Sequence, residues 1–429
     1  MAAPTVVFFP EGAFGPTNNC VGIGDVLRRR GARVVFVIEE SFQGTLEAKG
    51  FEERLMRLGP APEEPEVPGQ FWKDYIAETA PVFRTSTLDQ LEGFIKPTWE
   101  ALTDGARYVE PRLREIFDEL RPDVIVEDNV VAFPAVVTAD APWVRIMSCN
   151  PLEMKDPELP PPFSGYRTDE RDRFEEFREE YARTHGELHA SFSQWAQEQG
   201  APALPGIDFI HESPDLDLYL YPAEADYPRS RPLASSWERL ESCVRATDEP
   251  FELPEEQREG EGALVYLSLG SLGSADVELM QRLIDELAES RHRVLVSMGP
   301  RHDELRLAGN MAGAEFLPQA SLLPQVDLVI THAGNNTTTE SFHFGRPMVA
   351  LPVFWDQHDN ATRIEEAGFG RRLDTYGFED GELCRAVDEV LADRALLGRL
   401  DALSRRLQAA PGTKRAADLI ERLARSGSS

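Results

Sequence analysis

The sequence predicts an α/β protein with two doubly wound, parallel-sheet domains that face each other across a cleft. Three observations lead to this fold class. The chain has 429 residues, which is long for a single hydrophobic core. Short apolar runs alternate with amphipathic segments in both halves, as expected of parallel strands that helices cover on both faces. A proline-rich, acidic stretch separates the halves, and the alternation begins again after it.

Local patterns define the elements of the first half. Residues 19–31 combine apolar periodicity with a terminal glycine, which is typical of a helix and its C-terminal cap. Residues 69–83 predict a partly apolar helix, and residues 165–200, dense in Arg, Glu and Asp, predict a solvated helical face. The predicted strands of this half are the apolar runs 5–9, 33–39, 122–128 and 214–222.

The second half repeats this order after residue 262. An amphipathic helix that starts at an acidic cap is predicted at 276–290, and a last helix at 416–426. The predicted strands are the runs 263–271, 292–299, 326–334 and 345–352. We therefore expect an N-terminal domain, a linker, a C-terminal domain and a final helix, with the bounds 1–235, 236–262, 263–409 and 410–429.

Composition excludes several classes of function. The chain has 75 acidic and 44 basic residues, and a formal net charge of −31 disfavours nucleic acid as a partner. The four cysteines lie far apart without a C-x-x-C pair, so we expect neither a disulfide framework nor a structural zinc site. We see no signal-peptide pattern and no apolar stretch of about 18 residues. A cytoplasmic protein without a membrane partner is expected.

The block at residues 314–370 carries the functional prediction. A buried strand, "DLVIT", leads into the turn "HAGNN", and a helix then runs to Gly345. The free N–H groups of that helix and the positive end of its dipole predict an anion site. Gly334 would let the backbone approach a phosphate closely, and Asn336 and Thr337 would offer side-chain donors.

Further polar residues surround this predicted anion site. His332, at the strand tip, could donate a hydrogen bond to a diphosphate oxygen or neutralise its charge. Glu340, one helical turn deeper, could accept hydrogen bonds from both hydroxyls of a ribose. Asp356 and Gln357 follow the next strand, and a paired acid and amide suit the hydroxyls of a sugar.

This block resembles the donor-binding signature of the family 1 glycosyltransferases, which form the UDP-glycosyltransferase superfamily and have the GT-B fold. The family pattern runs W-x-P-Q, L-L, H-G-G-x-N-T/S-x-x-E and P-x-x-x-D-Q. The matching letters here are "FLPQ" (316–319), "LL" (322–323), "HAGNNTTTE" (332–340) and "PVFWDQ" (352–357). Phe316 replaces the usual Trp, and Ala333 replaces a glycine. Within the superfamily, the chain is similar to the macrolide glycosyltransferases.

The resemblance implies two domains, of which the second holds a nucleotide sugar as co-substrate, without a metal or another cofactor. Phe316 would stack on the nucleobase, Glu340 would bind the ribose, and Asp356 and Gln357 would bind the donor sugar. The last helix would cross back to the N-terminal domain. The residues implied in donor binding are Gly270, Ser271, Phe316, Leu317, Gln319, His332, Gly334, Asn335, Asn336, Thr337, Glu340, Asp356 and Gln357.

The chain departs from the family at the catalytic base. In the family, a His just after the first strand deprotonates the acceptor hydroxyl, and an Asp orients this His. The matching position here is Pro16, and no histidine precedes His185. Asp128, at the end of the strand 122–128, resembles the orienting Asp and could be the base itself if burial raises its pKa. Glu11, on the same loop as Pro16, is a second candidate.

The acceptor is expected to bind in the N-terminal domain. The predicted acceptor residues are Phe14, Asn18, Phe71, Trp72 and Phe133. Their aromatic character indicates an apolar pocket for a small molecule. For Phe71 and Trp72, an ordinary core position explains the pattern equally well.

We therefore predict an inverting, metal-independent glycosyltransferase, a monomer or homodimer, that acts on a hydrophobic polyketide, macrolide or phenolic. It would move a hexose, with glucose favoured by Asp356 and Gln357, from a UDP- or dTDP-sugar to a hydroxyl. Other functions stay open at this point. The donor phosphate could suffice as a base for an acidic phenol, or the chain could bind a nucleotide sugar without catalysis. A nucleotide-sugar epimerase or hydrolase on the same fold is a further alternative.

Overall fold

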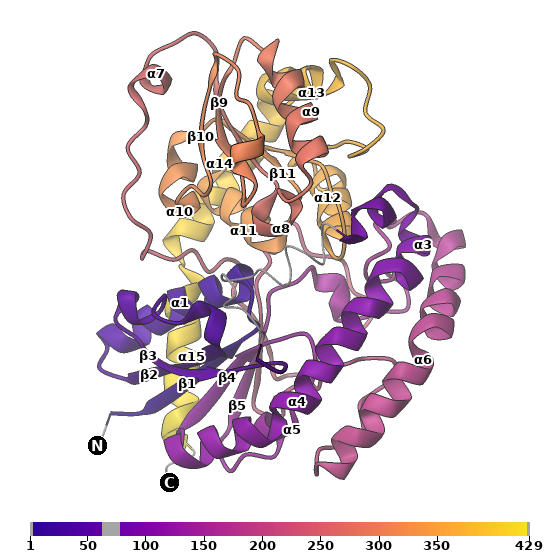
Figure 1. Ribbon diagram of the computed structural model, residues 1–429, viewed down its shortest axis with the longest axis vertical. Coiled ribbons are helices and arrows are strands. Elements are labelled where there is room, and N and C mark those ends of the chain that lie inside the picture. The colour runs from indigo at the N-terminus through magenta and orange to yellow at the C-terminus, as the bar shows by residue number, and fades with distance from the viewer. Residues whose placement is uncertain (1–2, 62–77, 427–429) are drawn as a thin grey trace.

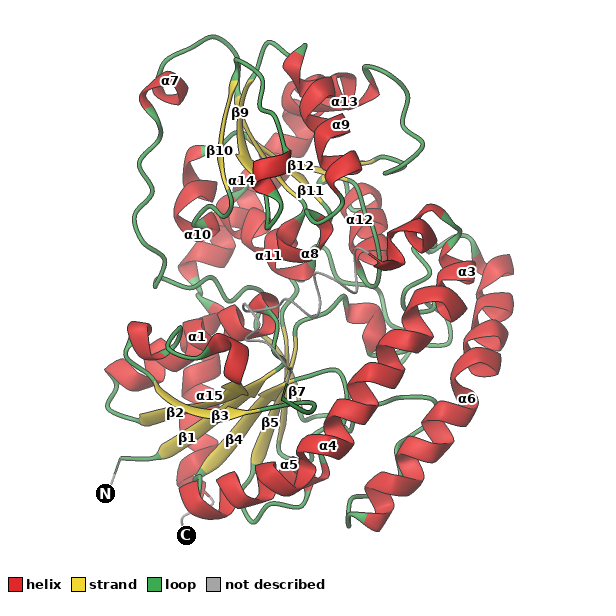
Figure 2. Cartoon of the chain, viewed as in Figure 1, coloured by secondary structure: helices red, strands yellow, loops and turns green. Residues whose placement is uncertain are grey.

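The computed structural model describes residues 3–61 and 78–426. It contains two α/β domains, one above the other in Figure 1. Each domain has one parallel sheet with helices packed around it (Figure 2), so the predicted fold class is confirmed. Within the described residues, no helix combines the length and the apolar composition needed to cross a bilayer.

The sheet of the N-terminal domain has seven strands in the order β3-β2-β1-β4-β5-β6-β7. Its strands are β1 (Thr5–Pro10), β2 (Arg33–Glu39), β3 (Glu52–Met56), β4 (Val124–Asp128), β5 (Trp143–Met147), β6 (Leu216–Tyr219) and β7 (Trp237–Arg239). Among the described residues, this domain has the helices α1 (Phe14–Arg29), α3 (Thr87–Gln90), α4 (Lys96–Leu120), α5 (Pro134–Val137) and α6 (Phe174–Glu198). The strand order reverses between β1 and β4, and ligands of such sheets bind at the carboxyl ends of the strands at this point.

The sheet of the C-terminal domain has six strands in the order β10-β9-β8-β11-β12-β13 and reverses between β8 and β11. Its strands are β8 (Leu264–Ser268), β9 (Arg293–Ser297), β10 (Met311–Ala314), β11 (Leu328–Thr331), β12 (Met348–Ala350) and β13 (Gly370–Arg372). The remaining helices are α7 (Glu255–Arg258), α8 (Gly270–Gly273), α9 (Val277–Ala288), α10 (Gln319–Leu322), α11 (Asn335–Phe344), α12 (Gln357–Glu366), α13 (Glu382–Ala392), α14 (Arg394–Ala409) and α15 (Gly412–Ser426).

Helix α1 begins at Phe14, earlier than predicted. Pro16 lies in its first turn, where the N–H that proline lacks would have no intrahelical partner. The loop between β1 and α1 is therefore only residues 11–13, so Pro16 is not on the same loop as Glu11, and Asn18 and Asn19 are helical. As a result, the first turns of α1 lie at the carboxyl end of β1 and carry polar side chains to the cleft.

Two other segments differ from the prediction. The short strand β7 lies inside the stretch 236–262 expected to be linker, and it pairs with β6 through the register Asp217↔Trp237. Helix α6, expected to be a solvated face, has aromatic residues at positions that face the core. Those residues are Phe174, Phe177 and Phe192. The charged residues between them concealed this apolar face in the sequence.

The last helix, α15, leaves the C-terminal domain and packs on α1 in the N-terminal domain, where Figure 1 shows it in yellow. Ala416, Ala417 and Ile420 are fully buried and share a core with Val21 and Ile23 of α1. The two domains are therefore joined twice, once by the segment after β7 and once by the segment between α14 and α15.

Candidate active site

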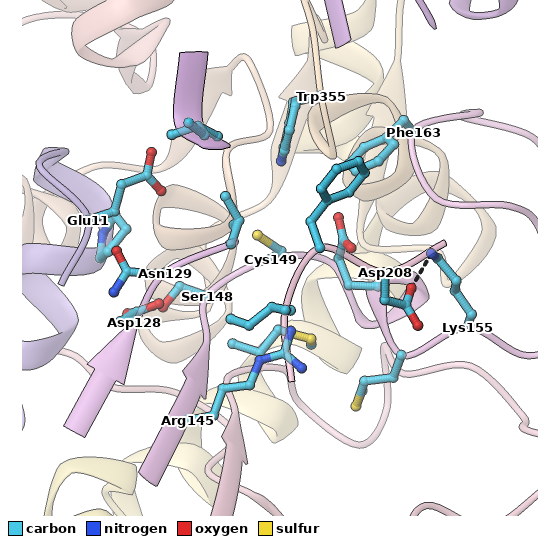
Figure 3. Close-up of a pocket in the computed structure, with 18 of the residues that line it drawn as sticks. Glu11, Asp128, Asn129, Arg145, Ser148, Cys149, Lys155, Phe163, Asp208 and Trp355 are labelled. Atoms are coloured by element: carbon cyan, nitrogen blue, oxygen red, sulfur yellow. Dashed lines mark hydrogen bonds and ion pairs between the residues drawn. The ribbon is translucent and has the colours of Figure 1, made fainter. Parts of the chain in front are cut away.

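A cavity of about 830 Å³ lies between the domains, a size typical of small-molecule sites. Most of its wall comes from the N-terminal domain, while Ser271, His332 and Gln357 come from the C-terminal domain. Figure 3 shows Glu11 and Asp128 on one side of the cavity, with aromatic side chains on the other. The structure thus brings together the two candidate bases and part of the predicted donor site.

Asp128 ends β4 at the wall of this cavity and is only 2% exposed. Burial raises the pKa of its carboxyl to about 7, and the charge of Glu11 acts in the same direction. Ser148, just after β5, opposes this shift because its Oγ donates a 2.6 Å hydrogen bond to Asp128 Oδ2. A carboxyl group that titrates near neutral pH can accept a proton from a substrate hydroxyl.

Glu11 follows β1 directly and lies beside Asp128 at the edge of the sheet. Its backbone N–H donates a 2.9 Å hydrogen bond to the Asp128 carbonyl oxygen. Burial, with repulsion from Glu39, raises the pKa of the Glu11 carboxyl to about 7. Both carboxyl groups line the cavity, so the geometry alone leaves both as candidate bases.

A series of hydrogen bonds joins Asp128 to the predicted donor-binding turn of the other domain. Asn19 Nδ2, on α1, donates 2.8 Å hydrogen bonds to Ser148 Oγ and to Asn336 Oδ1. Asn336 Nδ2, in the first turn of α11, donates in turn to the Gly15 carbonyl oxygen at 2.8 Å. The predicted diphosphate residue Asn336 is therefore connected to the candidate base through Asn19 and Ser148, which the sequence analysis did not identify.

The predicted anion site is formed by the turn between β11 and α11. Burial lowers the pKa of His332 to about 4, so this ring is neutral near pH 7. It can donate a hydrogen bond to a diphosphate, but it cannot neutralise its charge. Two glycines make room for the ring. A Cβ on Gly270, which has a φ of 71°, would lie 2.7 Å from His332 Cε1, and a Cβ on Gly334 would lie 2.4 Å from His332 Nε2. Ser271, next to Gly270, lines the cavity.

Glu340, the predicted ribose ligand, is buried in α11 and has two partners. Its Oε1 lies 2.7 Å from Arg245 Nη1, and its Oε2 accepts a 2.7 Å hydrogen bond from Gln319 Nε2. Thr337 Oγ1 donates to Gln319 Oε1 at 3.3 Å. Arg245 also pairs with Asp248, so a cation from the segment after β7 holds the predicted ribose carboxylate.

Two phenylalanines face each other across the cleft. Phe316, predicted to stack on the nucleobase, is 45% exposed, and its ring centroid lies 6.3 Å from that of Phe14. Phe14, predicted to bind the acceptor, lines the cavity and also lies close to Phe316, the predicted nucleobase residue. Leu317, beside Phe316, is partly buried against the core of its own domain.

Two predicted donor residues join the domains instead of facing the cavity. The Asp356 carboxylate is buried and accepts a 2.8 Å hydrogen bond from the backbone N–H of Asn150 in the N-terminal domain. Asn335 Nδ2 donates to the Leu220 carbonyl oxygen at 3.4 Å, again across the interface. Gln357 does line the cavity, so it is the member of the acid–amide pair that a donor sugar could contact.

Two of the predicted acceptor residues, Phe133 and Asn18, do not lie at the cavity wall. Phe133 does not line the cavity, because it is buried and packs edge-to-face against Phe9 at 4.7 Å. Asn18 also lies off the cavity wall, on a different face of α1 from Asn19. Phe71 and Trp72 fall outside the described residues.

The aromatic wall of the cavity comes instead from residues that the sequence analysis missed. Trp355, between the predicted Asp356 and its preceding strand, contacts Trp99 at 5.0 Å and Phe163 at 4.7 Å between ring centroids. Trp355 has a φ of 58°, in the left-handed region that large residues rarely adopt. This backbone conformation directs an indole ring of the C-terminal domain against aromatic residues of the N-terminal domain.

Comparisons with known proteins agree with this geometry. The family model described as "UDP-glucoronosyl and UDP-glucosyl transferase" matches residues 215–411. NDP-glycosyltransferase YjiC of Bacillus subtilis (strain 168) is 32% identical over 161 residues, which are 37% of this chain and 41% of that relative. Oleandomycin glycosyltransferase of Streptomyces antibioticus is 25% identical over 425 residues, which are 97% of this chain and 90% of that protein.

A solved structure extends the similarity to the whole fold. The glycotransferase of kitacinnamycin gives a TM-score of 0.69 at 24% identity and covers 98% of this chain and 99% of its own. The two domains therefore form a GT-B fold. Residues 215–411 match the UDP-glucoronosyl and UDP-glucosyl transferase model, and over nearly its whole length the chain is similar to oleandomycin glycosyltransferase. It spans 41% of the length of YjiC, the first of these relatives.

Proposed function

We propose that this chain is a glycosyltransferase that moves a sugar from a nucleotide sugar to a hydroxyl group of a hydrophobic small molecule. One observation carries the proposal. The Asp128 carboxyl, with a pKa of about 7, and His332 of the predicted diphosphate site line the same cavity. A general base and an anion site on one cavity are what group transfer from a diphosphate requires.

In the proposed reaction, ionised Asp128 accepts the proton of the acceptor hydroxyl, whose oxygen attacks the anomeric carbon of the sugar. The bond between that carbon and the diphosphate oxygen breaks, and the configuration at the carbon inverts. The N–H groups in the first turn of α11 and the neutral His332 would donate hydrogen bonds to the departing diphosphate. The proton ends on Asp128, and solvent takes it up when product leaves.

The donor in this proposal is a UDP- or dTDP-hexose, and glucose is the sugar we favour. Gln357 supports a hydroxylated sugar, because its side-chain Oε1 is fixed by the backbone N–H groups of Val353 and Phe354. The aromatic wall formed by Trp99, Phe163 and Trp355 supports a phenolic or polyketide acceptor. Metal independence, a cytoplasmic location and a monomeric or dimeric state remain predictions.

A crossed donor–acceptor screen, read by mass spectrometry, tests this function. UDP- and dTDP-sugars would be combined with phenolic, macrolide and polyketide acceptors. We expect at least one pair to give the mass of a glycoside, and Asp128→Asn to remove that product. UDP binding in calorimetry without a glycoside from any pair would favour a second candidate, a nucleotide-sugar-binding protein. The replacement of the family histidine by Pro16 is the observation that favours this alternative.

A further inference from the structure

A row of three charged side chains crosses adjacent strands of the N-terminal sheet at the inner end of the cavity. Arg145, on β5, lies in register with Glu127 on β4 and with Asp217 on β6. Side chains at paired positions of neighbouring strands point to the same face of a sheet. Of these three residues, only Arg145 lines the cavity, and Figure 3 shows its guanidinium directed into it.

The guanidinium of Arg145 is buried, and within the described residues it has neither a hydrogen-bond partner nor an ion-pair partner. Its residue is only 9% exposed. Among residues 3–61 and 78–426, no acceptor forms a hydrogen bond with its side chain, no carboxylate lies within 4.0 Å, and its buried Nε has no partner. The contact made by its Cζ is with the ring of Trp237, 5.6 Å from the centroid. Buried charges are normally paired, because burial of an unpaired charge is costly.

Neither flanking acid lies within ion-pair distance of Arg145 among the described residues, although the charge of Arg145 lowers the pKa of both, as it does for Asp128 and Glu153. Asp217 Oδ1 accepts a 2.8 Å hydrogen bond from the backbone N–H of Ser213, so the carboxylate is oriented toward that loop. Burial raises the pKa of Glu127 to about 8, which leaves this carboxyl mostly protonated at pH 7. Both acids lie behind the cavity wall, whereas the guanidinium faces the cavity.

Two other cations of the same cavity, Lys155 and Arg229, differ from Arg145 in this respect, and Arg231 differs in being exposed to solvent. Lys155 pairs with Asp208 and also donates to the Ile207 carbonyl oxygen. Arg229 donates to the carbonyl oxygens of Met154 and Pro151. Their hydrogen bonds hold the surrounding loops, so the open donors of Arg145 are available to a ligand.

We propose that Arg145 forms an anion subsite in this cavity and binds a carboxylate group of the acceptor. The planar guanidinium can donate two parallel hydrogen bonds to a carboxylate, and a buried site strengthens them. The aromatic wall opposite, with Trp99, Phe163 and Trp355, suits the ring system of the same molecule. The acceptor class is therefore a hydroxylated aromatic or polyketide acid. The inference rests on the proposed function only in treating the cavity as the acceptor site.

Matched pairs of ligands test the subsite by binding alone. We would titrate three acids against their neutral partners by calorimetry, with saturating UDP present. The pairs are 7-hydroxycoumarin-4-acetic acid with 7-hydroxy-4-methylcoumarin, 4-hydroxycinnamic acid with its amide, and a hydroxyanthraquinone carboxylic acid with its amide. For the wild-type chain we expect at least one acid to bind about tenfold tighter than its partner, since a charge-assisted contact contributes about 1.4 kcal/mol or more. If no acid is preferred, the proposal is overturned.

Two variants identify the residue responsible. Arg145→Met should abolish the preference for the acid, while Arg145→Lys, which keeps the charge, should retain part of it. A preference that persists in Arg145→Met would also overturn the proposal. UDP affinity, which depends on the other domain, reports whether each variant is folded. If a variant does not fold, the comparison of acid and neutral ligand on the wild-type chain still tests the proposal. Sugar transfer is measured separately, so a carboxylate preference without any transfer would refute the enzyme function and leave the subsite intact.

Discussion

Ser148 Oγ donates a 2.6 Å hydrogen bond to Asp128 Oδ2. A residue just after β5 thus fixes the carboxyl group at the end of the neighbouring strand β4. The bond favours the ionised form of Asp128, whereas burial favours the neutral form. The balance holds the pKa of this carboxyl at about 7. A group in this balance can act as a base at neutral pH without the histidine that the superfamily normally uses.

Removal of the Asp128 carboxylate should strongly reduce turnover without reducing the affinity for the donor. We expect Asp128→Asn to lower kcat about 10²- to 10⁴-fold, the range for a lost general base. UDP affinity should stay within about twofold, because the predicted diphosphate site lies on the other domain. Steady-state kinetics and calorimetry measure the two effects. Glu11→Gln is the matched comparison, and a larger loss there than in Asp128→Asn would transfer the role of base to Glu11.

The pH dependence of kcat/KM should reflect the titration of the Asp128 carboxyl. Protonated Asp128 cannot accept a proton, so kcat/KM should fall as the pH decreases below about 7. Ser148→Ala removes a bond that stabilises the ionised form, so the pKa rises and this limb should move to higher pH. Ser213→Ala, at a buried serine that bonds to the Trp143 carbonyl oxygen instead, is the control. An identical profile in Ser148→Ala and wild type would contradict this assignment.

Burial of Asp128 should also appear in the pH dependence of stability. Its pKa is about 7 in the folded chain, against an ordinary value of 3.8. Folding therefore favours the protonated form, and the stability that this form provides is fully present below about pH 4 and lost as the pH rises through 7. Asp128→Asn should raise Tm by a few degrees more at pH 8 than at pH 5 in thermal melts. Asp104→Asn, on the exposed face of α4, should show no such difference between the two pH values.

Stacking on Phe316 should contribute to nucleotide affinity. A base stacked on an aromatic ring is worth about 1–3 kcal/mol, so Phe316→Ala should weaken UDP binding about five- to a hundredfold. Phe316→Trp should bind UDP at least as tightly as wild type. Tyr108→Ala removes another exposed ring, remote from the cavity, and should leave affinity unchanged. Unaltered UDP binding in Phe316→Ala would place the nucleobase elsewhere.

The amide contact between the domains should influence the donor from the opposite side of the cleft. Asn19→Ala removes the 2.8 Å hydrogen bond to Asn336 Oδ1, so UDP affinity should fall about two- to tenfold, as for the loss of one hydrogen bond. In an Asn336→Ala background the same change should have little further effect, and a double-mutant cycle in calorimetry measures this coupling. Asn18→Ala, the neighbouring amide, is the control. Additive effects of Asn19→Ala and Asn336→Ala would show that the contact does not couple the domains.

Local patterns predicted much of the fold. Strand β1 and helix α9 have nearly the predicted bounds, because continuous apolar runs and regular amphipathic periodicity depend on adjacent residues. Helix α11 ends at Gly345 as predicted, since this residue adopts the left-handed conformation that glycine favours. The short strands β3 and β13 carry few apolar residues and gave no such signal.

Site residues could be predicted only where they form a sequence motif with a characteristic spacing. The turn from His332 to Glu340 is contiguous, so its residues could be placed together from the sequence. The partners of Asn19 lie 129 and 317 positions away along the chain, at Ser148 and Asn336, and no local pattern indicates such contacts. Arg145 was missed for the same reason, because a single arginine in an apolar strand shows neither its burial nor its missing partner.

The return of α15 to the N-terminal domain makes the C-terminal domain an insertion within the N-terminal one. An exchange of this domain with that of a relative therefore needs two junctions, one after β7 and one near Pro411. A chimera with only the first junction would place a foreign α15 against the resident α1. The small side chains Ala416 and Ala417 would then be replaced where they fit closely against Val21. Modular design of new donor specificities in this chain should keep its own last helix.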